Sequence, residues 1–317
     1  MKKVYITRKI QDVGIEMLKN YFDVDMNFED RALTKEELIT KAQKYDAILT
    51  QLNDKVDKEV IEKSKNVKIF ANYAVGFNNI DIDEANKKGI IVSNTPDVLS
   101  DTTAELAWAL LFAVSRRIVE GEEYIRAGKW NKFSPTLFLG RDITNKTLGI
   151  IGAGRIGKSF AKKSLGFDMK ILYHNRNKDH EFEEKYNAEW VDKETLLKES
   201  DFISLHVPLT EKTRNMITKE EFKLMKNTAI IINTSRGPVI NEEDLINALV
   251  NKEIWGAGLD VFHKEPNVPR KLIELDNVVT LPHIGSATTE TRNKMSEIAA
   301  KNIIEVLNGR EPITPVK

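Results

Sequence analysis

The chain has 317 residues, of which 41% are hydrophobic and 30% are charged; this balance excludes a wholly disordered protein and suits two globular domains. Forty-eight lysines and arginines balance 48 aspartates and glutamates, so the basic excess typical of a nucleic-acid-binding protein is missing. Cysteine is absent, which excludes disulfides, thiolate zinc sites, iron–sulfur clusters and a cysteine nucleophile. We expect no bound metal.

No segment of the sequence indicates export or insertion into a membrane. The first residues, Met1–Arg8, turn polar after three apolar residues, which is too few for a signal peptide. The longest apolar stretch, Leu106–Val114, falls well short of the roughly 20 residues that span a bilayer. We therefore expect a cytoplasmic protein that binds neither membranes nor nucleic acids.

The first part of the chain alternates short β-rich runs with stretches that have helical apolar spacing. The expected strands are Val4–Thr7, Val24–Asn27, Ala47–Thr50, Lys68–Ala71 and Ile90–Ser93. The expected helices are Val13–Tyr21, Lys35–Gln43, Lys58–Lys63 and Ile82–Lys88. This alternation predicts a small α/β domain with a doubly wound parallel sheet of flavodoxin-like size.

A long helix is expected next, over Thr102–Val114, with Ser100 or Asp101 as its cap. Because it is apolar nearly all round, it should be buried between two domains. A second series of strands follows, and several are almost wholly apolar, as strands buried on both faces should be. These are Thr147–Ile151, Lys170–Tyr173, Phe202–Val207, Ala229–Asn233, Gly256–Val261 and Val278–Leu281. Six is the number of strands in a complete dinucleotide-binding sheet. A last helix, Glu290–Leu307, could pack back on the first domain.

The segment from Gly152 to Gly157 has the pattern G-x-G-x-x-G, which by itself also occurs in glycine-rich turns of other folds. Here an apolar strand, Leu148–Ile151, leads into it and a helical stretch, Ile156–Leu165, leaves it. In a dinucleotide-binding turn, Gly152 would permit the tight bend, Gly154 would let the backbone approach a pyrophosphate, and Gly157 would allow close packing. The context favours that interpretation.

The end of the next strand decides between the two nicotinamide dinucleotides, because an acid there binds a ribose hydroxyl and an arginine accepts a 2′-phosphate. The strand Ile171–Tyr173 is followed by His174–Lys178, with no acid before Asp179. The cations Arg176 and Lys178 therefore favour NADP(H), with NAD(H) as the alternative. The plainer interpretation is that both are solvated loop charges.

The sequence has five histidines, and His283 differs from the others because it directly follows a predicted strand. Ligands of open α/β sheets bind at the carboxyl ends of strands, and reduction of a carbonyl needs a proton donor for the oxygen. Glu265, which follows the preceding strand, could pair with His283 and favour its charged form. Of the other four, His180 is expected to be solvated, and His206 to be structural or close to the cofactor. His174 and His263 are loop candidates for which the sequence suggests no partner.

Arg236 follows another buried strand, within Asn233–Gly237. Its planar, permanently charged guanidinium suits a substrate carboxylate or carbonyl, although an arginine neutralised by a nearby acid is the plain alternative. Polar residues at three consecutive strand ends are harder to attribute to accident.

Taken together, these residues resemble the D-isomer-specific 2-hydroxyacid dehydrogenase family over nearly the whole chain. The matching segments are Gly152–Gly157, Thr234–Gly237, Gly258–Phe262, Glu265–Pro266 and Pro282–Ser286. Within the family, Asn72–Asp81 looks most like glyoxylate/hydroxypyruvate reductases. The resemblance implies reduction of small 2-oxo acids to D-2-hydroxy acids by a nicotinamide cofactor.

The resemblance also implies a role for each matching position. His283 would be the proton donor, Glu265 its partner, and Arg236 the group that binds the oxo acid with backbone amides near Val75 and Gly76. The cofactor contacts would be Thr103, Gly152, Gly154, Arg155, Ile156, Gly157, Asn175, Arg176, Val207, Pro208, Thr234, Asp260 and Gly285.

The family layout implies a Rossmann dinucleotide-binding domain over residues 100–287 and a substrate-binding domain over 1–99 and 288–317, with the active site in the cleft between them. Hinges are expected near Asn94–Ser100 and Ser286–Thr289. Family members are typically homodimers, and the apolar stretch Ser134–Leu139 suits an arm that exchanges between subunits; a loop packed on its own subunit is the alternative.

The chain departs from the family pattern in one respect that bears on function, since the usual acid after the second strand of the dinucleotide-binding domain is absent. Three alternatives remain open. A glycerate or phosphoglycerate dehydrogenase differs mainly in substrate, and a formate dehydrogenase would carry Gln where Glu265 stands. The third is a nucleotide-sensing binding protein on the same fold, like the corepressors that keep the catalytic residues.

Overall fold

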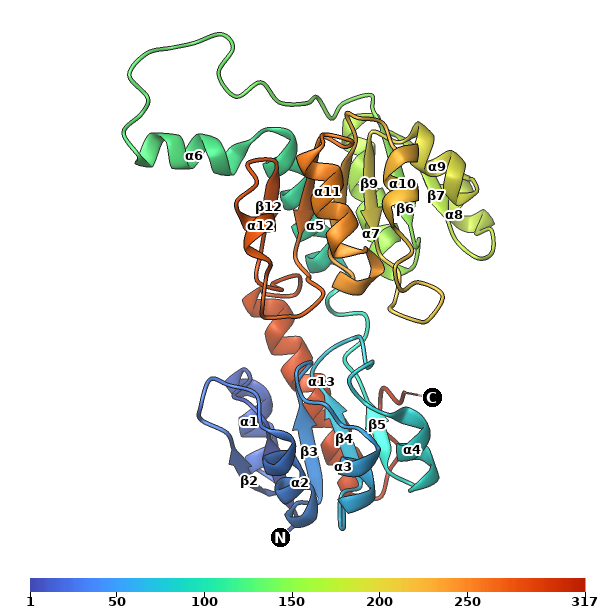
Figure 1. Ribbon diagram of the computed structural model, residues 1–317. Coiled ribbons are helices and arrows are strands. Elements are labelled where there is room, and N and C mark those ends of the chain that lie inside the picture. The colour runs from blue at the N-terminus through green and yellow to red at the C-terminus, as the bar shows by residue number, and fades with distance from the viewer. Residues whose placement is uncertain (317) are drawn as a thin grey trace. The chain divides into compact units, whose positions relative to one another are not determined.

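The computed structural model describes residues 1–316, and the chain divides into two compact units (Figure 1). The first unit comprises Met1–Leu99 and the residues from Ser286 onward, and the second comprises Ser100–Gly285. Gly285, the last residue of the second unit, donates its amide to Asp260 of the same unit at 2.7 Å.

The first unit contains a five-stranded, fully parallel sheet in the order β2-β1-β3-β4-β5. This is the flavodoxin-like strand order, in a domain for which the sequence predicts a parallel sheet of flavodoxin-like size. Its strands are β1 (Lys3–Ile6), β2 (Asp23–Met26), β3 (Ala47–Thr50), β4 (Ile69–Asn72) and β5 (Ile91–Ser93). Its helices are α1 (Asp12–Lys19), α2 (Lys35–Lys44), α3 (Lys58–Lys63), α4 (Ile82–Lys87) and α13 (Thr289–Leu307).

Alternating side chains of this sheet serve two cores, because successive residues of a strand face opposite sides. Ile48, Phe70 and Val92 are buried in one core with residues of α2, α3 and α4. Helices α1 and α13 pack on each other, and α13 also contacts β3 and β4. At the helix crossing, a Cβ on Gly14 would lie 2.3 Å from the Ser296 hydroxyl, so only glycine permits this approach. The last helix therefore completes the first unit.

The second unit contains a seven-stranded parallel sheet in the order β12-β11-β10-β9-β6-β7-β8. Its strands are β6 (Thr147–Ile151), β7 (Lys170–His174), β8 (Ala188–Trp190), β9 (Phe202–Leu205), β10 (Ile230–Asn233), β11 (Gly256–Leu259) and β12 (Val278–Thr280). Its helices are α5 (Ser100–Ser115), α6 (Ile118–Arg126), α7 (Arg155–Ser164), α8 (His180–Tyr186), α9 (Lys193–Glu199), α10 (Lys219–Leu224), α11 (Glu242–Val250) and α12 (Arg270–Ile273), with 3-10 turns η1 (Leu165–Phe167) and η2 (Gly237–Val239).

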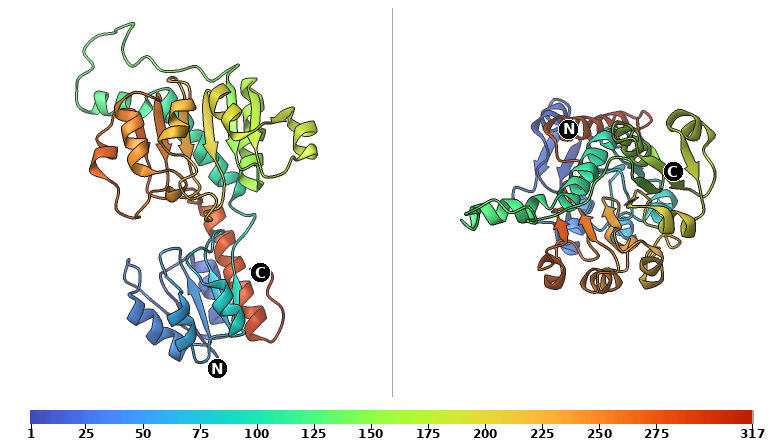
Figure 2. Two further views of the ribbon diagram at one scale, coloured as in Figure 1. Left: turned by 45° about the vertical axis from the view of Figure 1, so that its right-hand side comes forward. Right: turned by 90° about the horizontal axis from the view of Figure 1, so that it is seen from above.

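Helices cover both faces of this sheet (Figure 2), which explains its apolar strands. In β10, Ile230 and Ile232 pack with α5 and α7, whereas Ile231 packs with α9, α10 and α11. Helix α5 contacts β10, β11 and α7, so it covers one face of the second sheet.

Two expectations about this unit are wrong. The sheet has seven strands rather than six, because the edge strand β8 is only three residues long, Ala-Glu-Trp, and has no apolar run to reveal it. Neither Ser100 nor Asp101 caps α5, since the helix starts at Ser100 and includes both. Instead, the Asp101 carboxylate accepts a 2.9 Å hydrogen bond from Lys163 of α7. No helix among residues 1–316 has the length and apolarity needed to cross a bilayer.

Candidate active site

The glycine-rich turn after β6 has the geometry of a phosphate-binding turn. Gly152 has a φ of +97°, which favours glycine, and a Cβ there would lie 2.8 Å from the His206 carbonyl carbon and from Val207. At Gly157, a Cβ would lie 2.3 Å from the Gly152 carbonyl oxygen, so the helix packs directly on the turn. At Gly154, by contrast, a Cβ would meet no atom within 4 Å. The backbone there is open to a ligand.

The same turn lies at the switch point of the sheet, where β6 has β7 on one side and β9 on the other. Ligands of doubly wound sheets bind at such points. Thr234, at the end of β10, is 8% exposed, and its hydroxyl has no hydrogen-bond partner in the described structure. An orphaned buried hydroxyl and an open glycine backbone at one sheet edge fit a bound dinucleotide.

The loop after β7 carries cations, and the nearest acid, Asp179, is engaged in other interactions. Asp179 caps α8 by accepting from the Phe182 amide at 3.0 Å, and it pairs with Lys158 at 2.5 Å. Lys158 lowers the pKa of Asp179 more than burial raises it. Arg176 is exposed, and the structure gives it no ion pair with the described residues. Asn175 holds the turn, because its side chain accepts from the Ala153 amide at 2.7 Å.

His283 and Glu265 form a direct pair, with 2.6 Å between His283 Nδ1 and Glu265 Oε2. Burial alone would raise the pKa of Glu265, but the hydrogen bond and charge of His283 and the Phe262 amide outweigh it and hold that pKa below its usual value. An ionised carboxylate only accepts, so Nδ1 carries the proton and Nε2 is left for another partner. The Phe262 amide donates to the second oxygen, Oε1, at 3.0 Å.

Asp260 fixes the turn that carries His283. Its carboxylate is fully buried and accepts the amides of Ile284 and Gly285, both at 2.7 Å. Burial raises the pKa of Asp260 to about 6, although both amides and the charge of His283 act in the opposite direction. His283 itself has a φ of +55°, a left-handed conformation that is costly for a non-glycine residue. The two hydrogen bonds that follow it hold that conformation.

The turn that carries Arg236 packs directly on the backbone of the loop that carries Glu265. A Cβ on Gly237 would lie 2.0 Å from the carbonyl carbon and oxygen of Phe262, so the two turns touch where only glycine fits. Asn233 supports this turn, since its side chain donates to the Arg236 carbonyl at 3.0 Å. Burial lowers the pKa of Arg236, and the charge of Glu265 opposes that change. The residues Asn233 and Gly237 were not among the predicted site residues.

The other expected contacts of the second unit lie around the same edge. Thr103 of α5 is next to Gly285, where a Cβ would come within 3.4 Å of the Thr103 methyl group. Arg155 and Ile156 open α7, and Val207 and Pro208 directly follow the β9 region. The His206 ring forms a 2.9 Å hydrogen bond with the Ser204 hydroxyl, and burial lowers the pKa of His206 to about 3, so the ring is neutral. Val75 and Gly76 belong to the first unit.

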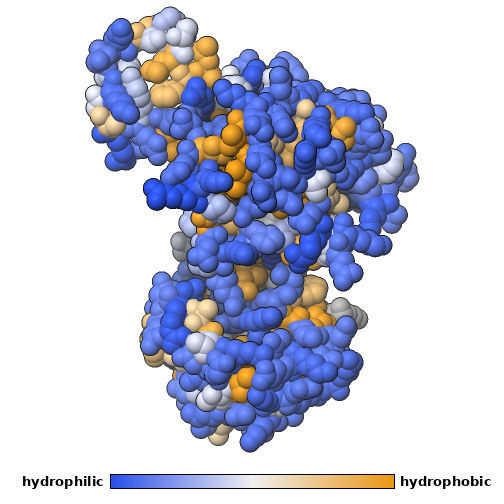
Figure 3. Space-filling model, viewed as in Figure 1, coloured by the Kyte–Doolittle hydropathy of each residue, from blue (hydrophilic) through white to orange (hydrophobic). Residues whose placement is uncertain are grey.

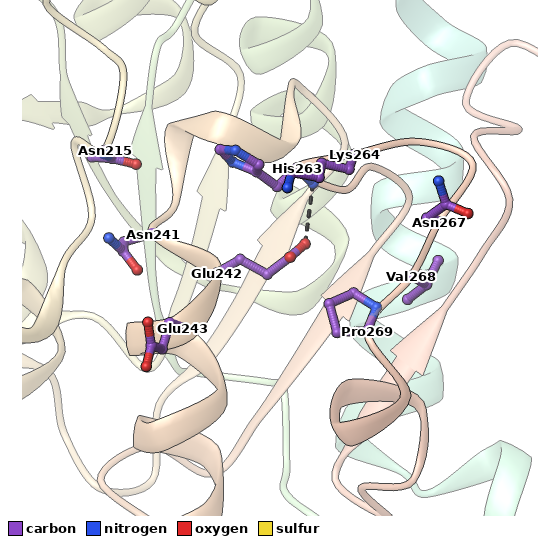
Figure 4. A pocket seen from close by; sticks show the side chains of 9 residues that line it. All are labelled: Asn215, Asn241, Glu242, Glu243, His263, Lys264, Asn267, Val268 and Pro269. Atoms are coloured by element: carbon purple, nitrogen blue, oxygen red, sulfur yellow. Dashed lines mark hydrogen bonds between the residues drawn. The ribbon is translucent and has the colours of Figure 1, made fainter.

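A pocket of about 480 Å³, most of whose lining residues are polar, lies beside the loop between β11 and α12 that carries Glu265 (Figure 4). In it, the carboxylate of Glu242, in the first turn of α11, accepts the His263 amide at 3.1 Å. This bond fastens the start of the loop to α11. Within the described residues, no three histidine, aspartate or glutamate side chains are grouped so that they could hold a metal ion.

Three neighbouring strands, β10, β11 and β12, are thus followed by a half-buried guanidinium, a carboxylate and an imidazole. The guanidinium can hold an anion, and the imidazole can donate a proton from Nε2 while the carboxylate stabilises its charge. A dinucleotide-binding turn lies along the same edge. This set of groups suits proton-coupled reduction of an anionic carbonyl compound.

Comparison with known proteins gives consistent matches. The model of the D-isomer specific 2-hydroxyacid dehydrogenase NAD-binding domain matches residues 108–285. The glyoxylate reductase of Thermococcus litoralis is 52% identical over 98% of this chain and 95% of its own length. The crystal structure of the TT0316 protein of Thermus thermophilus has a TM-score of 0.92 and 39% identity, and covers 99% of this chain and 100% of that one.

A third match was solved with ligands bound. It is the NADPH-dependent glyoxylate/hydroxypyruvate reductase of Sinorhizobium meliloti in complex with NADP and malonate. Its TM-score is 0.88 with 29% identity, over 99% of this chain and 96% of that chain.

Replacing Gly154 by Val should separate ligand binding from folding. A Cβ at this position would meet no protein atom within 4 Å, so we expect the melting temperature to stay at the wild-type value. The new methyl groups would occupy the space of a pyrophosphate, so the Kd for NADPH and NADH should rise at least tenfold, or about 1.4 kcal/mol. Fluorescence titration of the reduced dinucleotides would measure this, with Gly166→Val, another open glycine, as the control. Unchanged affinity for both would mean that the dinucleotide binds elsewhere.

Proposed function

Because the chain belongs to the D-isomer-specific 2-hydroxyacid dehydrogenase family, and is therefore an oxidoreductase acting on the CH–OH group, we propose that it reduces glyoxylate and hydroxypyruvate to the corresponding 2-hydroxy acids. The observation that carries this proposal is the 2.6 Å pair of His283 and Glu265 one strand away from the turn of Arg236. The names of the relatives support these two substrates.

His283 is the proton donor in this proposal. Its Nδ1–H is held by Glu265, so the proton that reaches the substrate leaves from Nε2 and goes to the carbonyl oxygen. The ionised Glu265 stabilises the imidazolium before transfer and keeps the ring in one orientation afterwards. In the reverse direction, the neutral imidazole takes the hydroxyl proton at the same atom.

Arg236 binds the 2-oxo acid through its guanidinium, whose planar fork matches a carboxylate or a carboxylate and carbonyl together. Backbone amides near Val75 and Gly76 supply further donors to the substrate carboxylate. These groups neutralise the substrate's charge and orient its carbonyl. Orientation and charge neutralisation both lower the free-energy barrier of the reaction.

The cofactor is held by the turn from Gly152 to Gly157, by Thr234 and by Thr103, and when bound its nicotinamide supplies the hydride. We propose a preference for NADPH over NADH. Arg176 is exposed at the end of β7, and the nearest acid, Asp179, is paired with Lys158 and caps a helix. A 2′-phosphate would therefore meet a cation and no free carboxylate.

We further propose a homodimer in which α6 and the loop after it pack on a second copy. Large apolar side chains are exposed there: Ile125 by 61%, Trp130 by 59%, Phe133 by 82% and Leu139 by 61%. Figure 3 shows hydrophobic residues gathered on this projecting part of the second unit. A monomer in light scattering would contradict this.

A cytoplasmic location completes the proposal, since a dissociable dinucleotide must be recycled by other enzymes.

Oxidation of NADPH and NADH with glyoxylate and with hydroxypyruvate tests the proposed reaction. The wild-type protein should turn over with both acids, and His283→Ala should lower kcat by a factor of about 10² to 10⁴ while the cofactor Kd stays the same. Near-wild-type turnover of the variant would refute the role of His283. No turnover of the wild-type protein with either acid would move the assignment to a bulkier oxo acid or to nucleotide sensing.

The pH dependence of reduction should shift when the charge of Glu265 is removed. The low pKa of Glu265 keeps it ionised through neutral pH, where it favours the imidazolium form of His283. In Glu265→Gln the negative charge beside His283 is lost, so the decline of kcat/KM for reduction at high pH should begin at a lower pH. A profile with an unmoved midpoint would leave Glu265 as a structural residue only.

The cofactor preference should depend on Arg176. In Arg176→Ala, kcat/KM for NADPH should fall about tenfold or more, since a charge-assisted contact to the 2′-phosphate is lost, whereas the value for NADH should hardly change. Arg270→Ala, which removes an arginine paired only with Glu274 on the surface, is the matched control. A clear wild-type preference for NADH, or an equal loss with both cofactors, would disprove the proposed recognition of the 2′-phosphate.

A further inference from the structure

The loop that follows β4 in the first unit presents three successive amides with nothing to donate to. The N–H groups of Val75, Gly76 and Phe77 make no hydrogen bond to any described residue. The carbonyls of the same three peptide groups, by contrast, are all engaged. A role for this arrangement rests on the proposed function, in which amides of this loop receive the substrate carboxylate.

Each of the three carbonyls has its own donor, at the same distance. The Ala74 carbonyl accepts from the Thr95 amide at 2.8 Å. The Val75 carbonyl accepts from the side chain of Asn94, and the Gly76 carbonyl from the side chain of Asn72, again at 2.8 Å each. Two asparagines from the ends of different strands thus hold adjacent peptide groups.

This arrangement determines where the free amides point. A carbonyl and the following N–H belong to one planar peptide group, and in a trans peptide they point in opposite directions. The one cis peptide bond among the described residues is Glu265–Pro266, so these peptides are trans. The N–H of Gly76 therefore points away from Asn94, which holds the Val75 carbonyl, and the N–H of Phe77 points away from Asn72, which holds the Gly76 carbonyl. Successive backbone amides that are left free to donate can bind an anion.

We propose that Asn72 and Asn94 are positioning residues, which orient the backbone donors of this loop toward the substrate carboxylate without touching the substrate. Pre-oriented donors bind an anion more strongly than mobile ones, because the cost of ordering them is met during folding.

Asn72 is fixed in the orientation that this role needs. It is fully buried at the end of β4, and its side-chain oxygen accepts from the Thr50 hydroxyl at 3.1 Å and from Asn79 at 3.2 Å. These two donors occupy the oxygen side of the amide, so its nitrogen must face the Gly76 carbonyl.

Asn94 is fixed by the segment that follows α13. The backbone amide of Asn94 donates to the Thr314 carbonyl at 3.2 Å, and the backbone carbonyl of Asn94 accepts from the Thr314 hydroxyl at 2.6 Å. Asn302 of α13 holds Thr314 in turn, accepting from its amide at 2.9 Å. In Figure 1 this segment runs beside β5, where Pro315 forms a bridge with Ser93. The segment after α13 therefore contributes to the geometry of the loop.

The test is the split between substrate and cofactor parameters in Asn72→Ala and Asn94→Ala. The KM for glyoxylate should rise about five- to tenfold, the effect of one misplaced hydrogen-bond donor, while the Kd for NADPH stays the same. The Kd of oxalate, an unreactive dicarboxylate probe, should rise by the same factor in calorimetry on the NADPH complex. Thr314→Val should change both values in the same direction by a smaller factor.

Asn27→Ala is the matched control, because Asn27 directly follows β2 of the first unit, is 8% exposed and donates to a loop carbonyl, that of Arg31, at 3.2 Å. It should lower the melting temperature as much as the test variants and leave both KM and the oxalate Kd unchanged. An active wild-type enzyme whose Asn94→Ala and Asn72→Ala variants keep the wild-type KM and oxalate Kd would overturn this inference alone. A wild-type protein that neither reduces glyoxylate nor binds oxalate would overturn the proposed function and the inference with it.

Discussion

The buried carboxylate of Asp260 is the point on which the second unit's site depends. It accepts two backbone amides at 2.7 Å, and those amides belong to the turn that carries His283. The left-handed backbone of His283, with φ of +55°, needs such support, and the imidazole reaches Glu265 only from that turn. One side chain at the end of β11 thus places a side chain at the end of β12. The pairing of His283 and Glu265 is a consequence of this backbone arrangement.

The same principle acts at the edge of the first sheet. There too, side chains at strand ends hold the backbone of a neighbouring loop rather than a ligand: Asn72 is the last residue of β4, and Asn94 follows β5. Parallel strands favour such contacts, because the carboxyl ends of all the strands lie at one edge of the sheet. In each sheet, one layer of buried polar side chains holds the turns, and the turns present the groups that face outward.

Much of the fold follows from the sequence alone, because buried parallel strands are continuous apolar runs and helices have their own spacing. Ala47–Thr50 and Thr147–Ile151 agree with the structure residue for residue. Strand β8 lacks such a run and could not be found. The strand-end positions of Arg236, Glu265 and His283 were likewise predictable, since the strands before them were.

What supports those residues could not be predicted from the sequence. The partners of Asp260 are backbone amides 24 and 25 residues away. Every residue except proline has a backbone N–H, so the sequence does not show which of them binds a given carboxylate. The close approach at Gly237 depends on where a distant turn lies, and most loop glycines serve only to let the backbone bend. Nothing in the sequence distinguishes Asn72, the last residue of β4, or Asn94, which follows β5, until the carbonyls that they hold are known.

The division of the first unit into two stretches of chain has a consequence for biosynthesis. Helix α13 covers the face of the first sheet beside α1, yet it leaves the ribosome only after the whole second unit. The second unit is continuous and can fold as it emerges, whereas the face of the first sheet beside α1 stays exposed until residues 289–307 arrive. The nascent chain therefore carries an unfinished hydrophobic surface throughout most of its synthesis, the state in which ribosome-associated chaperones would find it.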